Sequence, residues 1–240
     1  MSKIAIVAAL EREVRPLVKG WRVSERQHSG RNFRFFETEE AVLVCGGIGA
    51  EAARRAAEAV IVLYQPGIVY SVGYAGSLDP AIGVGEIVRP ARIIDTRDGS
   101  SIAIAGGEGV LVTAGGVAGP AQKRVLRDSF AAQAVDMEAS AVARAAQARG
   151  IDFGVVKAIS DAFDFALPAN DRFVDSRGRF MEMRFATYVA VRPWLWRRVI
   201  KLGHNSRLAT KALCRALREL LDNRVLAPFA HSQTSKTEAR

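Results

Sequence analysis

Short runs of apolar residues recur along the first 160 positions and alternate with alanine-rich segments of helical period. The apolar runs predict strands at 3–9, 41–45, 67–73, 85–95 (interrupted at Pro90), 109–113, 132–137 and 153–160. The helical pattern covers 50–64 and 138–150, and a shorter helix is expected from Glu11. Fully apolar strands that alternate with helices indicate a sheet covered on both faces. We therefore expect a three-layer α/β/α fold with a central, mostly parallel mixed sheet.

The character of the sequence changes after Asp164. Residues 165–180 have the composition of a loop, and helical segments are expected near 180–190, 193–203 and 206–222. The last segment places apolar residues on one face and basic residues on the other; the apolar set is Leu208, Ala209, Ala212, Leu213, Ala216, Leu217 and Leu220. The predicted organisation is one domain over 1–190, basic amphipathic helices that complete it over 191–224, and a disordered tail over 225–240.

Composition narrows the class of protein. With 240 residues and 49% hydrophobic content, the chain can bury a large core and is not a disordered protein. Its two cysteines, Cys45 and Cys214, lack metal-ligand spacing, which argues against a disulfide framework and fits a reducing compartment. The N-terminus is expected to be a strand and not a signal peptide, and no stretch has the pattern of a membrane span.

The charge of the chain is concentrated near its C-terminal end. The net charge is +9, and residues 190–224 hold nine Lys or Arg residues against Glu219 and Asp222, a local excess of +7. Such a segment suits an anionic partner, which leaves nucleic acid and a membrane surface as candidates.

Two carboxylates stand in the otherwise apolar or small stretch "VDMEASA", residues 135–141. Asp136 and Glu138 are two positions apart, so they would point the same way in a strand. Charged groups are rarely placed in such surroundings without a partner or a task. Glu138 also suits the first turn of the following helix, where the helix dipole favours an acid. The stretch alone leaves both interpretations open.

Two further acidic positions follow strands. Asp161, after Ser160, ends the strand at 153–160, where it suits either a helix cap or a general acid, because burial favours the protonated form. Glu11 and Glu13 follow the first strand, where most acids simply begin a helix. The three histidines, His28, His204 and His231, lie outside these strand ends, which argues against a Ser-His-Asp triad or a histidine metal site.

Glycine-rich stretches follow or end two strands. "GGIGAEA" at 46–52 has the Gly-x-Gly-x-x-Ala form of a dinucleotide fingerprint, but 66–78 lacks the acid that would hold the ribose. We therefore expect a tight turn there, with no nicotinamide cofactor, no other cofactor and no metal. "VGYAGSL" at 72–78 suits either a tight turn or the ligand side of a strand end.

The motifs gain weight from their order. "AALEREV", "GGIGAEAA", "SVGYAGSL", "VDMEASAVA" and "KAISDAFD" follow one another within 1–164. This series resembles the purine nucleoside phosphorylase and nucleosidase superfamily, nearest to the nucleosidases that release adenine from methylthioadenosine and adenosylhomocysteine. The resemblance implies the phosphorylase-type fold for 1–190 and cleavage of a purine N-glycosidic bond.

The resemblance also implies roles for individual residues. Glu138 would bind the ribose hydroxyls, with Met137 packed on the sugar and Asp136 also counted as substrate-binding. Asp161, positioned by Ser160, would donate a proton or hydrogen bond to N7 of the leaving purine, and Glu13 would orient the attacking water. The remaining cleft residues would be Gly73, Tyr74, Ala75 and Gly76, with Val117 against adenine.

The chain departs from the family pattern at several points. The segment 95–113 is shorter than usual, and Tyr74 replaces a small hydroxyl residue of the nucleosidases. Ser71 stands where the phosphorylases usually carry an arginine. Water and phosphate therefore both remain candidate nucleophiles, although Glu13 favours water.

The C-terminal segment mixes Trp194, Trp196 and leucines with basic residues, as interfacial membrane helices do, although a final helix packed on the core would look similar. Together with the shortened middle, it resembles the hopanoid-associated branch, which implies the lipid-linked nucleoside adenosylhopane as substrate. The resemblance also implies a homo-oligomer and a cytoplasmic protein, in contact with the inner membrane surface through 191–224. The alternatives are a soluble methylthioadenosine/adenosylhomocysteine nucleosidase and, from another class, a basic non-catalytic nucleic-acid-binding module. The absence of a nucleic-acid-binding motif beside the basic residues argues against the module.

Overall fold

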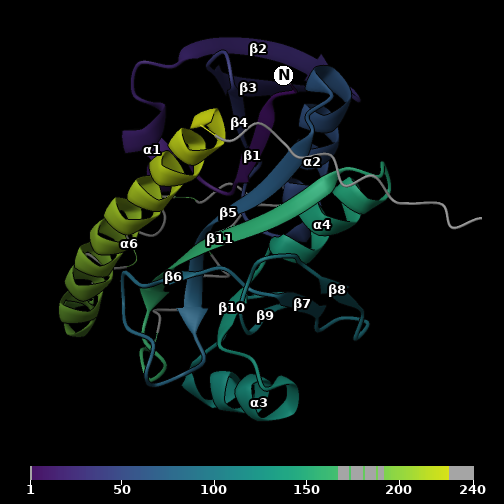
Figure 1. Ribbon diagram of the computed structural model, residues 1–240. Helices are drawn as coiled ribbons and strands as arrows, with labels where there is room; N and C mark the ends of the chain where they lie inside the picture. The colour runs from purple at the N-terminus through teal and green to yellow at the C-terminus, as the bar shows by residue number, and fades with distance from the viewer. Residues whose placement is uncertain (1, 167–172, 174–180, 182–187, 189–191, 227–240) are drawn as a thin grey trace, which may run out of the picture.

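In the computed structural model (Figure 1), the described residues are 2–166, 173, 181, 188 and 192–226. The strands are β1 Ile4–Ala8, β2 Arg22–His28, β3 Arg31–Glu37, β4 Ala41–Cys45, β5 Ile68–Ser77, β6 Ile87–Val88, β7 Arg92–Asp95, β8 Ser101–Ala103, β9 Val110–Thr113, β10 Ala134–Asp136 and β11 Asp152–Asp161. The helices are α1 Glu11–Val18, α2 Ala50–Tyr64, α3 Pro120–Phe130, α4 Ala139–Gln147 and α6 Pro193–Leu226.

The strands form one mixed sheet between two helical layers. Its order is β2-β3-β4-β1-β5-β10-β9-β7-β8, with β11 paired to β5 and β6 paired to β11. Among the described residues, five strand pairs are parallel and five are antiparallel. Helices α1 and α6 pack with one core of apolar side chains and α2 and α4 with another, on opposite faces of the sheet (Figure 1). The expected three-layer α/β/α fold is confirmed.

The continuous apolar runs predicted most of the strands, because the central ones, such as β1, β4 and β9, are buried on both faces. β1 and β4 are almost wholly buried, and the interruption expected at Pro90 separates β6 from β7. The hairpin of β2 and β3 was not predicted, because β2 is exposed along most of its length and carries polar residues on both faces. Helix α3 was not predicted either, since only two of its side chains, Lys123 and Leu126, are buried.

The predicted break in the strand at Gly73 was wrong. β5 continues to Ser77 because β11 pairs with it as far as Gly76 and β10 pairs with Gly76 and Ser77. Residues 72–78 are therefore not a turn. They form the second half of a long central strand.

Helix α6 joins the two C-terminal segments that the sequence predicted as separate helices. It packs on α1, β6 and β11, with Ala209, Leu213 and Leu217 in the core. Leu208, expected on the apolar face, is 42% exposed. Within the described residues, no helix is long and apolar enough to span a bilayer. The loop predicted at 165–180, the helix near 180–190 and most of the tail lie largely outside the described residues.

Candidate active site

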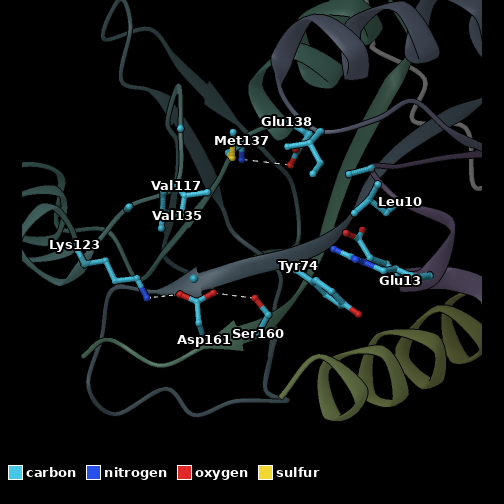
Figure 2. A pocket seen from close by; sticks show the side chains of 16 residues that line it. Leu10, Glu13, Tyr74, Val117, Lys123, Val135, Met137, Glu138, Ser160 and Asp161 are labelled. Atoms are coloured by element: carbon cyan, nitrogen blue, oxygen red, sulfur yellow. Dashed lines mark hydrogen bonds and ion pairs between the residues drawn. The ribbon is translucent and has the colours of Figure 1, made fainter. Parts of the chain in front are cut away.

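The sheet leaves a gap beside its central strand. On one edge of β5, β1 pairs as far as Ser71 and β10 begins to pair at Gly76. Because β1 runs parallel to β5 and β10 runs antiparallel, their C-terminal ends approach this gap from opposite directions. β11 occupies the other edge of β5 as far as Gly76. The topology therefore brings the residues that follow β1, β10 and β11 to one pocket (Figure 2).

Glu138 lies at the upper side of this pocket, between β10 and α4 (Figure 2). Its Oε1 accepts a 2.8 Å hydrogen bond from the backbone N–H of Gly49, in the glycine-rich turn before α2. Glu138 occupies the N-cap position of α4, but its side chain makes no capping hydrogen bond. Its carboxylate is therefore directed to the pocket and not to its own helix.

The glycine-rich turn is structural, as expected, and also orients Glu138. A Cβ on Gly46 would lie 2.8 Å from the carbonyl oxygen of Ala52 in α2, so the close backbone approach is real. Gly47 and Gly49 have φ of 106° and 93°, a region that favours glycine. The conformation of the turn therefore presents the Gly49 N–H to the carboxylate.

Glu13 lies in the first turns of α1 and faces the same pocket. Its side chain is buried, and Oε2 accepts no hydrogen bond from the described residues. Burial raises the pKa of Glu13 to about 8, and the nearby carboxylate of Glu138 adds to this rise. A buried polar atom without a partner is rare, and it suits a group that a ligand or water completes.

Lys157 places a positive charge near these two carboxylates. It stands in the middle of β11, is 1% exposed, and donates to Asp136 at 2.9 Å. Although burial lowers it, the carboxylates of Asp136 and Glu138 raise the pKa of Lys157 above its usual value. Burial also raises the pKa of Glu138, against the Lys157 ammonium. The cluster thus holds three acids around one lysine.

Asp136 and Glu138, although two positions apart, do different work. Asp136 accepts from the hydroxyl of Thr113 at 2.7 Å and from the N–H of Ala139 at 2.8 Å, besides its ion pair with Lys157. It therefore caps α4 and anchors β10 to β9. The role at the start of the helix, which the sequence left open for Glu138, is therefore filled by Asp136.

Asp161, which lines the pocket together with Glu13 and Glu138, lies at its opposite end (Figure 2). A bulge between Ile159 and Asp161 shifts the register of β11 there. The ammonium of Lys123, from α3, contacts Oδ2 of Asp161, and the Ser160 hydroxyl donates to Oδ1 at 2.9 Å. Lys123 and Asp161 are 1% and 4% exposed. The acid is thus held from two sides and already paired with a cation.

Two glycines of β5 make room for the acids. A Cβ on Gly76 would lie 2.9 Å from Oδ2 of Asp161 and 3.2 Å from the side chain of Lys123. A Cβ on Gly73, whose φ is 141°, would lie 2.8 Å from Oε2 of Glu13. The absence of side chains at Gly73 and Gly76 therefore makes room for the carboxyl groups of Glu13 and Asp161.

Most predicted site residues meet in this pocket. Those that line it are Glu13, Tyr74, Gly76, Val117, Met137, Glu138, Ser160 and Asp161. Three predicted positions do not line it: Asp136 faces Lys157, Gly73 makes room for Glu13, and Ala75 packs in an apolar cluster.

The sequence interpretation missed two lysines. Lys157 interrupts a strand of apolar residues, which is an unusual place for a charge. Lys123 lies three positions before Leu126, on the buried face of α3. A lysine within an apolar strand was the available signal for Lys157, whereas Lys123 shares its buried face with Leu126 alone and gave no such signal. Arg12 and Leu10 also line the pocket. Among the residues that the structure describes, no group of His, Cys, Asp or Glu side chains is placed to hold a metal ion.

Comparison with known proteins places the chain. The sequence model described as "Phosphorylase superfamily" matches residues 3–106 and 103–185. A 5'-methylthioadenosine/S-adenosylhomocysteine nucleosidase of Actinobacillus succinogenes is 29% identical over 200 residues, 68% of this chain and 86% of that protein. The same enzyme of a Marinomonas species is 29% identical over 98 residues, 39% of this chain and only 42% of that protein.

Solved structures agree on the fold. The futalosine hydrolase of Helicobacter pylori matches 92% of this chain and 98% of its own with a TM-score of 0.69, at 17% identity. At this identity, the match supports the fold alone. The family match ends at residue 185, so it does not include α6. From the family match, the curated relatives and the pocket, the chain belongs to the phosphorylase superfamily, as an enzyme of the nucleosidase type that cleaves N-glycosidic bonds.

Proposed function

We propose that this enzyme releases adenine from an adenine nucleoside, and that its preferred substrate is adenosylhopane, a nucleoside with a large apolar 5' substituent. One observation carries the first part of the proposal. Glu13 and Glu138 lie at one end of a pocket whose other end holds Asp161. The curated relatives, named as nucleosidases of methylthioadenosine and adenosylhomocysteine, support an adenine nucleoside as the substrate class.

The chemistry of the bond suits this separation of acids. When an N-glycosidic bond breaks, positive charge develops on the ribose and negative charge on the base. Glu138 would accept hydrogen bonds from the ribose hydroxyls and stabilise the sugar cation. Glu13, whose Oε2 has no hydrogen-bond partner among the described residues, would orient the attacking water. At the far end, Asp161 would hydrogen-bond or protonate N7 of the leaving adenine.

Helix α6 supports the lipid part of the proposal. Its first turns expose Trp194 and Ile200, 71% and 72% exposed, and Trp196 at 51%. Arg197, Arg198 and Lys201 stand among them, which is the pattern of a helix at an anionic membrane surface.

The pocket wall is tied to this helix. Tyr74, which lines the pocket, shares a 2.6 Å hydrogen bond with the hydroxyl of Thr210 in α6 and donates to the carbonyl of Ser206 at 3.1 Å. A 5' substituent that leaves the pocket past Tyr74 would meet α6 (Figure 2). The enzyme would then take its substrate at the membrane surface.

The substrate and the nucleophile can be tested together. Adenine release would be measured from 5'-methylthioadenosine and from adenosine with a long apolar 5' chain, each with and without phosphate. We expect higher kcat/KM for the long chain. Release that does not depend on phosphate would support water as nucleophile, and formation of a ribose 1-phosphate product would support phosphorolysis. Equal or better use of methylthioadenosine would favour the soluble nucleosidase, and no adenine release from either would contradict the proposal.

Membrane contact has a separate test. The wild-type protein should sediment with vesicles that contain anionic lipid at low salt and less so at high salt. The double variant W194S/W196S should lose this binding, whereas V125S, which changes an exposed valine on α3, should retain it. Absence of salt-sensitive binding would contradict the lipid part alone. The resemblance also leads us to expect a homo-oligomer, which light scattering would measure.

The alternative of a non-catalytic nucleic-acid-binding module is not supported, because the chain is an enzyme of this superfamily. Its basic charge does not require that function, since the cations of α6 suit a membrane surface equally well.

A further inference from the structure

The strongest unexplained feature of the pocket is Lys123. We propose that Lys123 is the positioning residue that supplies, through Asp161, the proton taken up by the leaving base. The inference rests on the proposed function, because it concerns the leaving base of the same reaction.

The surroundings of Lys123 make it a component of the site and not a solvated helix residue. Its ammonium contacts Oδ2 of Asp161 and donates to the carbonyl oxygen of Ala162 at 2.8 Å. The side chain is 1% exposed, although α3 is otherwise mostly at the surface. The pair lies directly against Gly76 of β5, whose missing Cβ leaves room for it. Burying a lysine is costly unless it is paired, so this contact is specific.

The pair changes what Asp161 can do. The ammonium of Lys123 donates to Oδ2 of Asp161 and the Ser160 hydroxyl donates to Oδ1, so both oxygens of the carboxyl group act as acceptors. A carboxylate that accepts at both oxygens has no proton of its own to give to N7 of the base. The nearest proton that is bound to a titratable group is on Lys123 itself.

The proton balance of the step is then complete. As the glycosidic bond breaks, its electron pair passes to the purine, Lys123 passes one of its ammonium protons to Asp161, and Asp161 passes a proton to N7. In the hydrolytic reaction, C1′ of the ribose bonds the oxygen of the attacking water, which releases one proton to the solvent. The result is a neutral lysine, an ionised Asp161 and a neutral purine, and Lys123 recovers its proton from water before the next turnover.

Other charged groups around the pair are few. On α3, Arg127 lies over the ring of Phe163 at 5.0 Å and pairs with Asp128 at 3.0 Å, so its charge is engaged at the surface. From β11 the facing group is Asp161, and β5 contributes Gly76, which has no charge. Glu13 and Glu138 lie across the pocket (Figure 2). Within the described residues, Asp161 is therefore the acid that contacts the ammonium of Lys123.

Two substitutions separate the proton from the charge. Lys123→Met removes both, whereas Lys123→Arg keeps the positive charge but holds its protons too tightly to release them. The two substrates would be 5'-methylthioadenosine, whose base needs a proton, and p-nitrophenyl β-D-ribofuranoside, whose leaving group needs none. Thermal melts would establish that each variant folds. If K123M does not fold, K123R alone still tests whether the proton of Lys123 is needed.

We expect both variants to lower kcat for methylthioadenosine about 10²–10⁴-fold and to leave the p-nitrophenyl substrate unchanged. In K123M, the optimum of kcat should also move to lower pH, because Asp161 must then carry its own proton. Wild-type kcat in K123R, or equal losses on both substrates, would overturn the inference. A wild-type enzyme that releases no adenine would overturn the proposed function and this inference together. An active wild type with an unimpaired K123M would overturn this inference alone.

Discussion

The two ends of the pocket differ in how their buried acids are paired with cations. At the sugar end, Glu13 and Glu138 are buried near each other, and burial raises the pKa of both carboxyl groups. At the base end, Asp161 already has a cation and a hydroxyl as partners. One end holds buried acids that outnumber their one lysine, Lys157, and the other holds a one-to-one pair of an acid and a lysine.

This difference matches what each end would have to stabilise. A developing sugar cation is stabilised by carboxylates that no protein cation has fully neutralised. A leaving base needs a proton and an oriented acceptor, which a lysine–carboxylate pair can provide. The two buried lysines differ in the same way. Lys157 pairs with Asp136, which does not line the pocket, whereas Lys123 pairs with Asp161, which does. Substitutions at either end can therefore test the comparison.

Asp161→Asn should have the largest effect. It keeps the shape of the side chain but removes the group that passes a proton to the base, so kcat should fall about 10²–10⁴-fold. Adenine release would be measured with methylthioadenosine as the probe. The matched control is D164N, an exposed acid three residues later, which should retain full activity.

The variant D161N also leaves the buried ammonium of Lys123 without its partner. The double variant D161N/K123M removes both charges and should recover thermal stability but not activity. Full activity in D161N would contradict the role of the base end.

Glu138→Gln should have the next largest effect. The amide can still accept from Gly49, so the turn should keep its conformation, but the charge at the sugar is lost. Removing one preorganised electrostatic group typically costs about 10²-fold or more in rate, and we expect a loss of this size in kcat/KM. E51Q, an exposed acid in the first turn of α2, is the control. Equal activity of E138Q and wild type would show that Glu138 serves only the structure.

The sequence was sufficient for the elements whose side chains are uniformly buried. β1, β4 and α2 follow directly from apolar runs and from helical periodicity, because packing and local preference agree there. β5 was predicted too short, since Gly73 and Gly76 suggested a turn. The structure places them in a strand because β10 and β11 supply the hydrogen bonds, which is tertiary information.

From the residue pattern alone, apart from the family resemblance, the site was predictable only at the acids that follow an apolar run. Glu13, Glu138 and Asp161 carried this signal and line the pocket. Which of Asp136 and Glu138 would face the pocket could not be predicted, because the choice depends on Lys157 and Thr113, which are distant in sequence. Lys123 could not be assigned either, since its partner follows 38 positions later in the chain.

Glu13→Gln tests the sugar end of the pocket through the pH dependence of the free energy of unfolding. Unfolded Glu13 loses its proton near pH 4.5 and folded Glu13 near pH 8. Between these values the folded state binds more protons, so the free energy of unfolding falls as pH rises. The variant E13Q removes this dependence and should gain on the order of a few kcal/mol over the wild type between pH 5 and pH 9.

Urea unfolding at both pH values would measure this gain. E11Q, which changes a half-exposed acid at the start of the same helix, should show the same pH dependence as the wild type. A gain in E13Q that is the same at pH 5 and pH 9 would contradict the raised pKa of Glu13.

Tyr74→Phe should have the smallest effect and tests the link between the pocket and α6. The substitution removes a hydroxyl that bonds Thr210 and Ser206, and one such bond contributes about 1 kcal/mol. The melting temperature should fall about 2–4 °C, while kcat on methylthioadenosine should hardly change. T210V removes the partner and should cost a similar amount, and the double variant should cost less than the sum because both changes break the same bond. Additive losses would show that the two hydroxyls act independently, so that the pocket wall and α6 are not coupled through this contact.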